Sequence, residues 1–303
     1  MIIPFQYVKI KLLRENLKKV VKNHEKLFAI LLSAIMLVGT VFALTACGAN
    51  AKVVVLEYHL TAESYAFAIN KEVGAEVKAA ANELLADMEE SGELDTLINS
   101  YFDGTSTFEY TNPASKEGCL VVATNAQFPP FEYKNGNKFT GIDMEIAKKL
   151  ADKMGKTLYI DDMEFDSVIT SVQTQIADIG MAGMTVTEKR KEAVDFSTEY
   201  YESAQVIMVL EGDDTFADCE SAEDIVAKLA EQDSTYKIGT QKGTTGYMYS
   251  YGDVDFGYDG FKNVETKAYD NGALAVQDML NGKINAVIID EQPAKMIAAT
   301  YNK

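Results

Sequence analysis

The stretch that decides the fold runs from Cys119 to Gly155 and reads "CLVVATNAQFPPFEYKNGNKFTGIDMEIAKKLADKMG". It opens with an apolar run typical of a buried strand and closes with a segment of helical periodicity. One face of the predicted helix carries its apolar side chains, Ile142, Ile146, Leu150 and Met154. Gly155 is a suitable C-terminal stop for this helix. The stretch therefore predicts a strand, a connection and a core-facing helix.

The same alternation continues to the end of the chain. Strand-like segments are predicted at 157–163, 177–183, 204–210, 236–241, 264–270 and 284–290. Helical segments are predicted at 166–175, 221–232, 271–283 and 291–303. Strands that alternate with helices favour an α/β architecture, and two such series indicate two lobes.

The N-terminal segment differs in kind from the rest of the chain. Residues 1–46 contain seven Lys or Arg against two Glu and end in "LFAILLSAIMLVGTVFALTA", a basic region followed by an apolar one of export length. The junction "LTAC" resembles the lipobox of bacterial lipoproteins. It predicts a signal peptide at 1–46, lipidation of Cys47 and a short tether at 47–50. An uncleaved transmembrane anchor is the alternative. Both interpretations place the rest of the chain outside the cytoplasm.

Charge and cysteine content argue against binding of nucleic acid, anionic lipid or a metal. Without residues 1–46, 21 basic and 44 acidic side chains remain, a net charge of −23. Such a surface repels nucleic acid and anionic lipid. Cys119 and Cys219 are expected to be two buried free thiols, with a disulfide as the alternative. Neither has a nearby partner that would suggest a metal site, and no cofactor is implied.

Several long motifs resemble one known family. "VVATNAQFPPFEYKNGNKFTGIDMEIAKKLADKMG", "MEFDSVITSVQT" and "ADIGMAGMTVTEKRKEAVDFSTEYYESAQVIMV" occur in that order, followed by "IGTQKGTTG" and "YDNGALAVQDMLNGKINAVIIDEQPA". They resemble the polar amino-acid-binding receptors of ABC importers, the family 3 solute-binding proteins. The resemblance implies the type II periplasmic-binding-protein fold, in which two α/β lobes are joined by two hinge crossings.

The segment before Cys119 looks displaced along the chain. Residues 51–60 and 64–69 are strand-like, and 71–101 form a helical pair broken at Gly92. In ordinary family members a segment such as "ESYAFAINKE" with a helical pair ending in "LINSYF" closes the chain. The sequence thus resembles a circular permutant, with lobe 1 at 64–202, including a linker at 103–118 between the old ends. Lobe 2 then comprises 51–61 and 203–303. A domain swap between two molecules is the alternative.

The resemblance assigns the two charged residues of the site. Arg190, in "TVTEKR", matches the family's clamp for the ligand carboxylate, and a guanidinium can hold both oxygens of that group. Asp290, at the end of "INAVIID", matches the position that binds the ligand ammonium from lobe 2. The alternatives are a surface ion pair for Arg190 and a helix cap for Asp290.

The resemblance also implies that threonines and backbone groups bind the ligand. By resemblance the Thr245 amide reaches the carboxylate from lobe 2, beside Thr244 in "KGTTG". An N-cap is the alternative role for these threonines, and both roles can hold together. Thr185 is expected to contact both charged groups, and the Gly183 carbonyl the ammonium.

The side-chain pocket is implied to contain Asn125, Phe128, Phe165, Ala182 and Gln241. The two aromatic residues could instead fill the core. Family members that bind cationic ligands or glutamine commonly carry an acid at the position of Asn125. A neutral amide there favours a neutral polar amino acid, with glutamine and cystine ahead of the basic ones.

These features predict an extracytoplasmic, lipid-anchored receptor that closes on a free amino acid. It is expected to be a monomer and to deliver its ligand to a permease and an ATPase on separate chains. The alternatives are a sensory receptor and a dehydratase-like enzyme on the same fold. His59, the single histidine after residue 46, is expected in a strand outside the site, which argues against catalysis.

Overall fold

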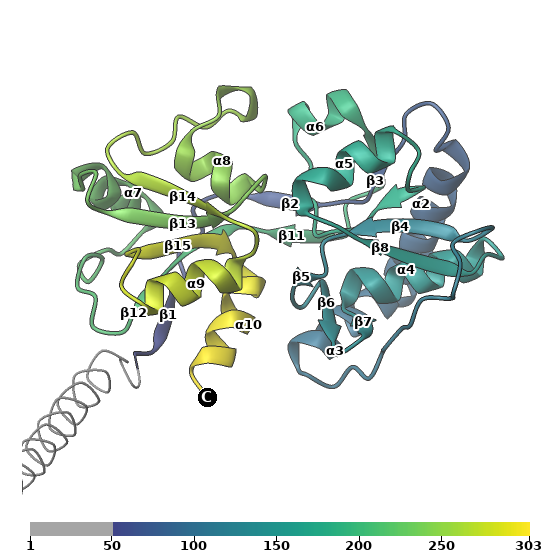
Figure 1. The fold of residues 1–303 in the computed structure, drawn as a ribbon, viewed down its shortest axis with the longest axis horizontal. Coiled ribbons are helices and arrows are strands. Elements are labelled where there is room, and N and C mark those ends of the chain that lie inside the picture. Colours follow the sequence, from purple (N-terminus) through teal and green to yellow (C-terminus); the bar gives the residue numbers. More distant parts are fainter. Residues whose placement is uncertain (1–50) are drawn as a thin grey trace, which may run out of the picture. The chain divides into compact units, whose positions relative to one another are not determined.

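The computed structural model describes residues 51–303 (Figure 1). The predicted signal peptide, the predicted lipidation site at Cys47 and the predicted tether lie outside these residues. None of the helices formed by residues 51–303 has the length and apolar character that a membrane crossing requires.

One lobe, here called lobe 2, is built on a five-stranded sheet with the order β1-β12-β15-β13-β14. Its strands are β1 (Val53–Leu56), β12 (Gln205–Leu210), β13 (Lys237–Gln241), β14 (Glu265–Tyr269) and β15 (Ala286–Asp290). β13 lies parallel to both β15 and β14, whereas β12 is antiparallel to β15 and to β1. Its helices are α7 (Ala222–Glu231), α8 (Thr245–Tyr251), the short 3-10 helix η1 (Val254–Phe256), α9 (Gly272–Leu280) and α10 (Glu291–Tyr301).

Helices cover both faces of this sheet. Alternate residues of β12 and β15 enter two different apolar clusters, one with α9 and α10 and one with α7. Because both faces are buried, the central strands carry continuous apolar runs rather than an alternating pattern, from Val206 in β12 and from Ala286 to Ile289 in β15.

The other lobe, lobe 1, has a second five-stranded sheet with the order β10-β3-β9-β4-β8. Its strands are β3 (Ala68–Ile69), β4 (Leu120–Thr124), β8 (Leu158–Asp162), β9 (Ile179–Gly180) and β10 (Asp195–Phe196). Its helices are α2 (Ala75–Ser91), α3 (Glu93–Phe102), α4 (Ile142–Lys153), α5 (Phe165–Gln173) and α6 (Glu188–Ala193). A small antiparallel sheet is added by β5 (Gln127–Phe128), β6 (Glu132–Asn135) and β7 (Lys138–Thr140).

The stretch that decides the fold supplies the centre of lobe 1. Leu120 and Val122 of β4 pack with α4 on one face of the sheet, and Val121 and Ala123 pack with α5 on the other. Ile142, Ile146 and Leu150 of the predicted α4 stripe are buried as expected, whereas Met154 is partly buried. Gly155 follows the last turn of the helix with φ +66°.

Two short strands join the lobes. β2 (Glu63–Tyr65) and β11 (Tyr201–Ser203) pair antiparallel, with Ser203 opposite Glu63. They run side by side between the two large sheets (Figure 1). The predicted two-lobed α/β fold with two hinge crossings is therefore confirmed.

Several local predictions were wrong. The strand expected at 64–69 is split between β2 and β3, and the one at 51–60 ends at Leu56, so His59 lies in a loop and contacts Glu291. Cys119 is half-buried rather than buried, because it stands at the start of β4 on the lobe surface, whereas Cys219 is buried. Both thiols are free, so the disulfide alternative is excluded.

The segment at 63–102 completes lobe 1 within the same chain. β3 pairs with β9 and β10, and α2 and α3 pack against α4. The linker at 103–118 follows the edge of the lobe, where the Asn112 side chain bonds the backbone of Ile160 on β8 and Tyr110 bridges to Phe139. The circular permutation concerns the order of these pieces relative to other family members, and it stays a prediction, as do the lobe boundaries.

Candidate functional site

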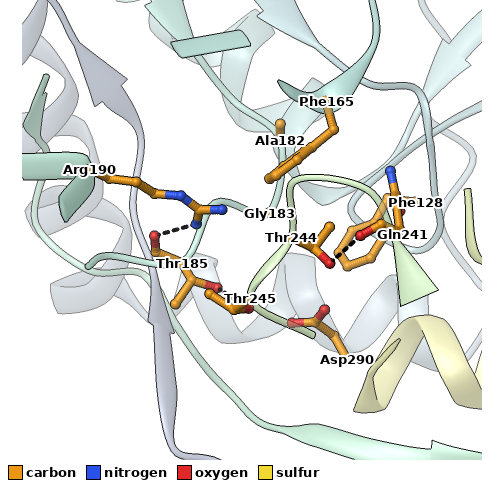
Figure 2. Close-up of a pocket in the computed structure, with 10 residues that line it drawn as sticks. All are labelled: Phe128, Phe165, Ala182, Gly183, Thr185, Arg190, Gln241, Thr244, Thr245 and Asp290. Atoms are coloured by element: carbon orange, nitrogen blue, oxygen red, sulfur yellow. Dashed lines mark hydrogen bonds between the residues drawn. The ribbon is translucent and has the colours of Figure 1, made fainter. Parts of the chain in front are cut away.

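Ten residues from both lobes surround one cavity (Figure 2). They are Phe128, Phe165, Ala182, Gly183, Thr185, Arg190, Gln241, Thr244, Thr245 and Asp290. All ten belong to the eleven residues that the sequence predicted. The space between their atoms is about 250 Å³, including the open mouth, and little of it is wide enough for a water molecule. The lobes are thus close together, and a ligand enters only when they or the side chains move.

Arg190 is placed by α6 at the edge of lobe 1. Its backbone N–H donates to the Thr187 N-cap, which fixes the first turn of the helix. Its guanidinium donates to the carbonyl of Thr185 (2.7 Å) and, across the lobes, to that of Gly243 (3.1 Å). The side chain is 5% exposed, so a surface ion pair is excluded. Burial lowers the pKa of Arg190 to about 10, although the nearby carboxylate of Glu63 acts in the opposite direction and raises it. The guanidinium therefore stays charged at neutral pH.

Asp290 closes the opposite side of the cavity at the end of β15. Its carboxylate accepts from the Tyr65 hydroxyl (2.5 Å) and from Ser203 (3.4 Å), both on the hinge strands. Although Asp290 precedes α10, its side chain makes no capping bond, so the capping alternative is wrong. Burial and the neighbouring Glu63 raise the pKa of Asp290 to about 7.

The "KGTTG" turn brings lobe 2 to the cavity. Gly243 has φ +77°, and a side chain there would press on Asp166, so the turn requires glycine. Thr244 accepts from the Tyr247 N–H as the N-cap of α8. Thr245 is the first residue of that helix, so its N–H has no partner inside the helix. The capping role is therefore confirmed for Thr244, and Thr245 presents its amide as a donor.

Asn125 does not line the cavity as expected. Its carboxamide oxygen accepts from Gln241 (2.9 Å), and its NH₂ group donates to the Met163 carbonyl (2.8 Å). Gln241 comes from lobe 2 and lines the cavity, so its hydrogen bond connects Asn125 to the cavity. The Gln241 carbonyl oxygen has no partner within residues 51–303.

Two aromatic residues and two small residues of lobe 1, Phe128, Phe165, Ala182 and Gly183, lie at the cavity. Phe128 and Phe165 line the cavity and also pack into the lobe 1 core, so both interpretations of these rings hold. Gly183, with φ +51°, lies so close to the Phe128 ring that a Cβ would come within 2.9 Å of it. Its N–H donates to the buried Asp143 (3.0 Å).

The sequence did not point to Glu63, the most connected acid beside the cavity. It is 7% exposed and accepts from the hydroxyls of Thr185 (2.7 Å) and Thr245 (2.8 Å). These partners lie 122 and 182 residues further along the chain, so no local spacing connects them. Only its place in a predicted hinge crossing could have indicated a role.

A model of the bacterial extracellular solute-binding proteins, family 3, matches residues 120–301. The chain belongs to this family. The solute-binding protein is 41% identical over 100 residues to an arginine-binding extracellular protein of Bacillus subtilis (strain 168), covering 32% of this chain and 39% of that one. It is 26% identical over 184 residues to the L-cystine-binding protein TcyJ of Escherichia coli (strain K12), covering 60% and 63%. It thus spans less than two thirds of these curated relatives.

Solved structures agree with the family. A mutant of arginine-bound ArgBP from T. maritima gives a TM-score of 0.51 at 30% identity, covering 61% of this chain and 79% of that one. The substrate-binding protein of an amino acid ABC transporter gives 0.51 at 31% identity, covering 61% and 75%. The fold of this solute-binding protein is the type II periplasmic-binding-protein fold.

Proposed function

We propose that the protein is the extracytoplasmic receptor of an ABC importer and binds a free polar amino acid between its lobes. One observation carries the proposal: a buried guanidinium from lobe 1 and a buried carboxylate from lobe 2 face the same cavity, together with backbone amides. An amino-acid zwitterion has the complementary pair of charges on two groups bonded to the same carbon atom. Only a closed cleft satisfies both ends of such a ligand, so binding selects closure.

Each group has a defined task in this proposal. Arg190 holds the ligand carboxylate, and the Thr245 amide donates to it from lobe 2. Asp290 and the Gly183 carbonyl accept from the ammonium. Phe128, Phe165 and Ala182 enclose the ligand side chain.

The preferred ligand in this proposal is a neutral polar amino acid, glutamine or cystine. The Gln241 carbonyl oxygen has no hydrogen-bond partner among residues 51–303, and its amide is held by the neutral Asn125 rather than by an acid. The arginine-binding relatives make arginine the competing ligand. We also propose lipid anchoring at Cys47, delivery to a permease and an ATPase on separate chains, and a monomeric receptor.

Binding without turnover is part of the proposal. His59 is 57% exposed and contacts Glu291 outside the cavity. Within residues 51–303, no cluster of three or more His, Cys, Asp or Glu residues could hold a metal ion. In this proposal the two charged side chains that line the cavity, Arg190 and Asp290, both serve to hold the ligand.

Calorimetric titration of the soluble chain, starting after Cys47, with the twenty amino acids and cystine tests the proposal. The expected result is one-to-one binding of glutamine or cystine in preference to arginine. Tighter binding of arginine would refute the specificity and keep the receptor. Absence of binding to any of these ligands would refute the receptor function.

A further inference from the structure

A buried carboxylate lies directly behind the cavity, where the hinge meets both lobes. Glu63 is the first residue of β2 and stands opposite Ser203 in the hinge pair. It does not line the cavity, but two of the lining residues, Thr185 and Thr245, are bonded to it.

Four donors converge on this carboxylate. One oxygen accepts from the hydroxyls of Thr185 of lobe 1 (2.7 Å) and Thr245 of lobe 2 (2.8 Å), with the Gln205 amide at 3.4 Å. The other oxygen accepts from the hydroxyl of Thr61 (2.7 Å). Because an ionised carboxylate only accepts, the threonine hydroxyls must be the donors. Glu63 therefore fixes the direction of both hydroxyl protons.

The consequence for the cavity follows from the single proton of a hydroxyl group. With both protons directed at Glu63, the oxygens of Thr185 and Thr245, 3.5 Å apart, can only accept from a third group. Thr185 keeps both lone pairs for this purpose. Thr245 keeps one, since its oxygen also accepts from Gln205 (3.3 Å). A ligand group that meets these two oxygens must be a donor, which suits an ammonium and not a carboxylate.

We propose that Glu63 is a positioning residue that sets the polarity of the site: it holds the Thr185 and Thr245 hydroxyls as acceptors for the ligand ammonium and ties them together across the lobes. This inference rests on the proposed function. It adds two acceptors to Asp290 and gives the hinge a direct part in recognition. The amino acid then binds in one orientation, with its ammonium toward the hinge and its carboxylate toward Arg190.

The test separates this role from a merely structural one by changing the ligand as well as the protein. The probes are L-glutamine and L-arginine, each compared with its analogue without the α-ammonium, 4-carbamoylbutanoate and 5-guanidinopentanoate. Glu63→Met keeps an unbranched side chain and removes the acceptor. Glu202→Met is the matched control, because Glu202 lies on the paired hinge strand and is exposed.

Affinities are measured by calorimetry, with weak ligands measured by displacement. Glu63→Met is expected to weaken binding of the amino acid about tenfold or more, as loss of hydrogen bonds to a charged group does. Binding of the analogue should stay within about threefold, since the freed hydroxyls are no longer fixed as acceptors. Glu202→Met should change neither affinity. Equal losses for both ligands, or no loss for either, would overturn the proposal.

Two further variants keep the test decisive if Glu63→Met does not fold. Thr185→Val and Thr245→Val each remove one hydroxyl and leave Glu63 in place. Each should again weaken the amino acid more than its analogue, and equal effects would contradict the inference. If the unmodified chain binds neither an amino acid nor cystine, the proposed function fails and this inference fails with it. If it binds an amino acid other than the two probes, that ligand and its analogue without the α-ammonium take their place. If it binds and the variants do not discriminate, only the inference fails.

Discussion

Replacing Arg190 by alanine removes the single cationic side chain among those that line the cavity. The residue is 5% exposed, and its charge is held between the Thr185 and Gly243 carbonyls, one from each lobe. Burial lowers its pKa only to about 10, so at neutral pH the guanidinium is charged and available to a carboxylate. The variant would leave a ligand carboxylate buried without its charged partner.

The magnitude follows from that burial. Removing one member of a desolvated ion pair costs about 3 to 5 kcal/mol, which corresponds to a loss of affinity of roughly a hundredfold to several thousandfold. An exposed pair would cost about 1 kcal/mol or less. Because Arg190 is buried, the larger cost of a desolvated ion pair applies to it.

Calorimetry with the best amino acid of the screen measures the loss. Lys191→Ala is the matched control, because Lys191 is the next residue of α6, is exposed, and pairs with Glu188 of the same helix. The control should bind within about twofold of the unmodified chain, and the thermal midpoint of each variant reports folding. Binding by a folded Arg190→Ala variant within about fivefold of the unmodified chain would show that the ligand carboxylate lies elsewhere.

Four further predictions concern protonation, specificity, backbone and assembly. Because burial and Glu63 raise the pKa of Asp290 to about 7, its carboxyl is mostly protonated near pH 6, and an arriving ammonium should expel up to about one proton. Affinity for the amino acid should therefore rise roughly tenfold per pH unit up to about pH 7 and then level off. Titration in buffers of different ionisation enthalpy measures the proton release. If the release persists in Asp290→Asn, the proton comes from another group. Asn125→Asp should shift preference toward arginine through Gln241, and an unchanged ranking by calorimetry would separate this pair from specificity. Gly141→Ala should lower the free energy of unfolding by about 2 kcal/mol or more, because Gly141 has φ +123° and a Cβ there would come within 2.2 Å of a backbone oxygen; Gly136→Ala, with open space around it, is the control and should cost less in chemical denaturation. Size-exclusion chromatography with light scattering should give a monomer, and a dimer that dissociates only on unfolding would favour the domain swap.

Local patterns in the sequence were sufficient for most of the fold. The apolar run of β4 and the stripe of α4 determine a buried strand and a core-facing helix by periodicity alone. The same reasoning missed α6 and the small sheet of β5, β6 and β7. These elements are short and partly polar, so they are stabilised by the lobe they lie on rather than by their own pattern.

The list of site residues came from motif resemblance, and ten of the eleven line one cavity. Asn125 was the exception, since a motif gives a position in the chain and not which side chain stands in front of another. Gln241 of lobe 2 reaches Asn125 of lobe 1 with a hydrogen bond because the two lobes lie close together.

The sequence by itself determined the chemistry available to this protein: an arginine after one strand, an aspartate at the end of another, and threonines at a glycine turn. Tertiary structure alone decided which of these groups act together. Glu63 contacts Thr185 and Thr245 because its hinge strand runs between the two lobes, next to the cavity. Asp290 accepts a hydrogen bond from Tyr65 and does not cap its own helix. Such contacts join residues more than a hundred positions apart, where local propensity has no influence, and closure of the chain around one cavity fixes them.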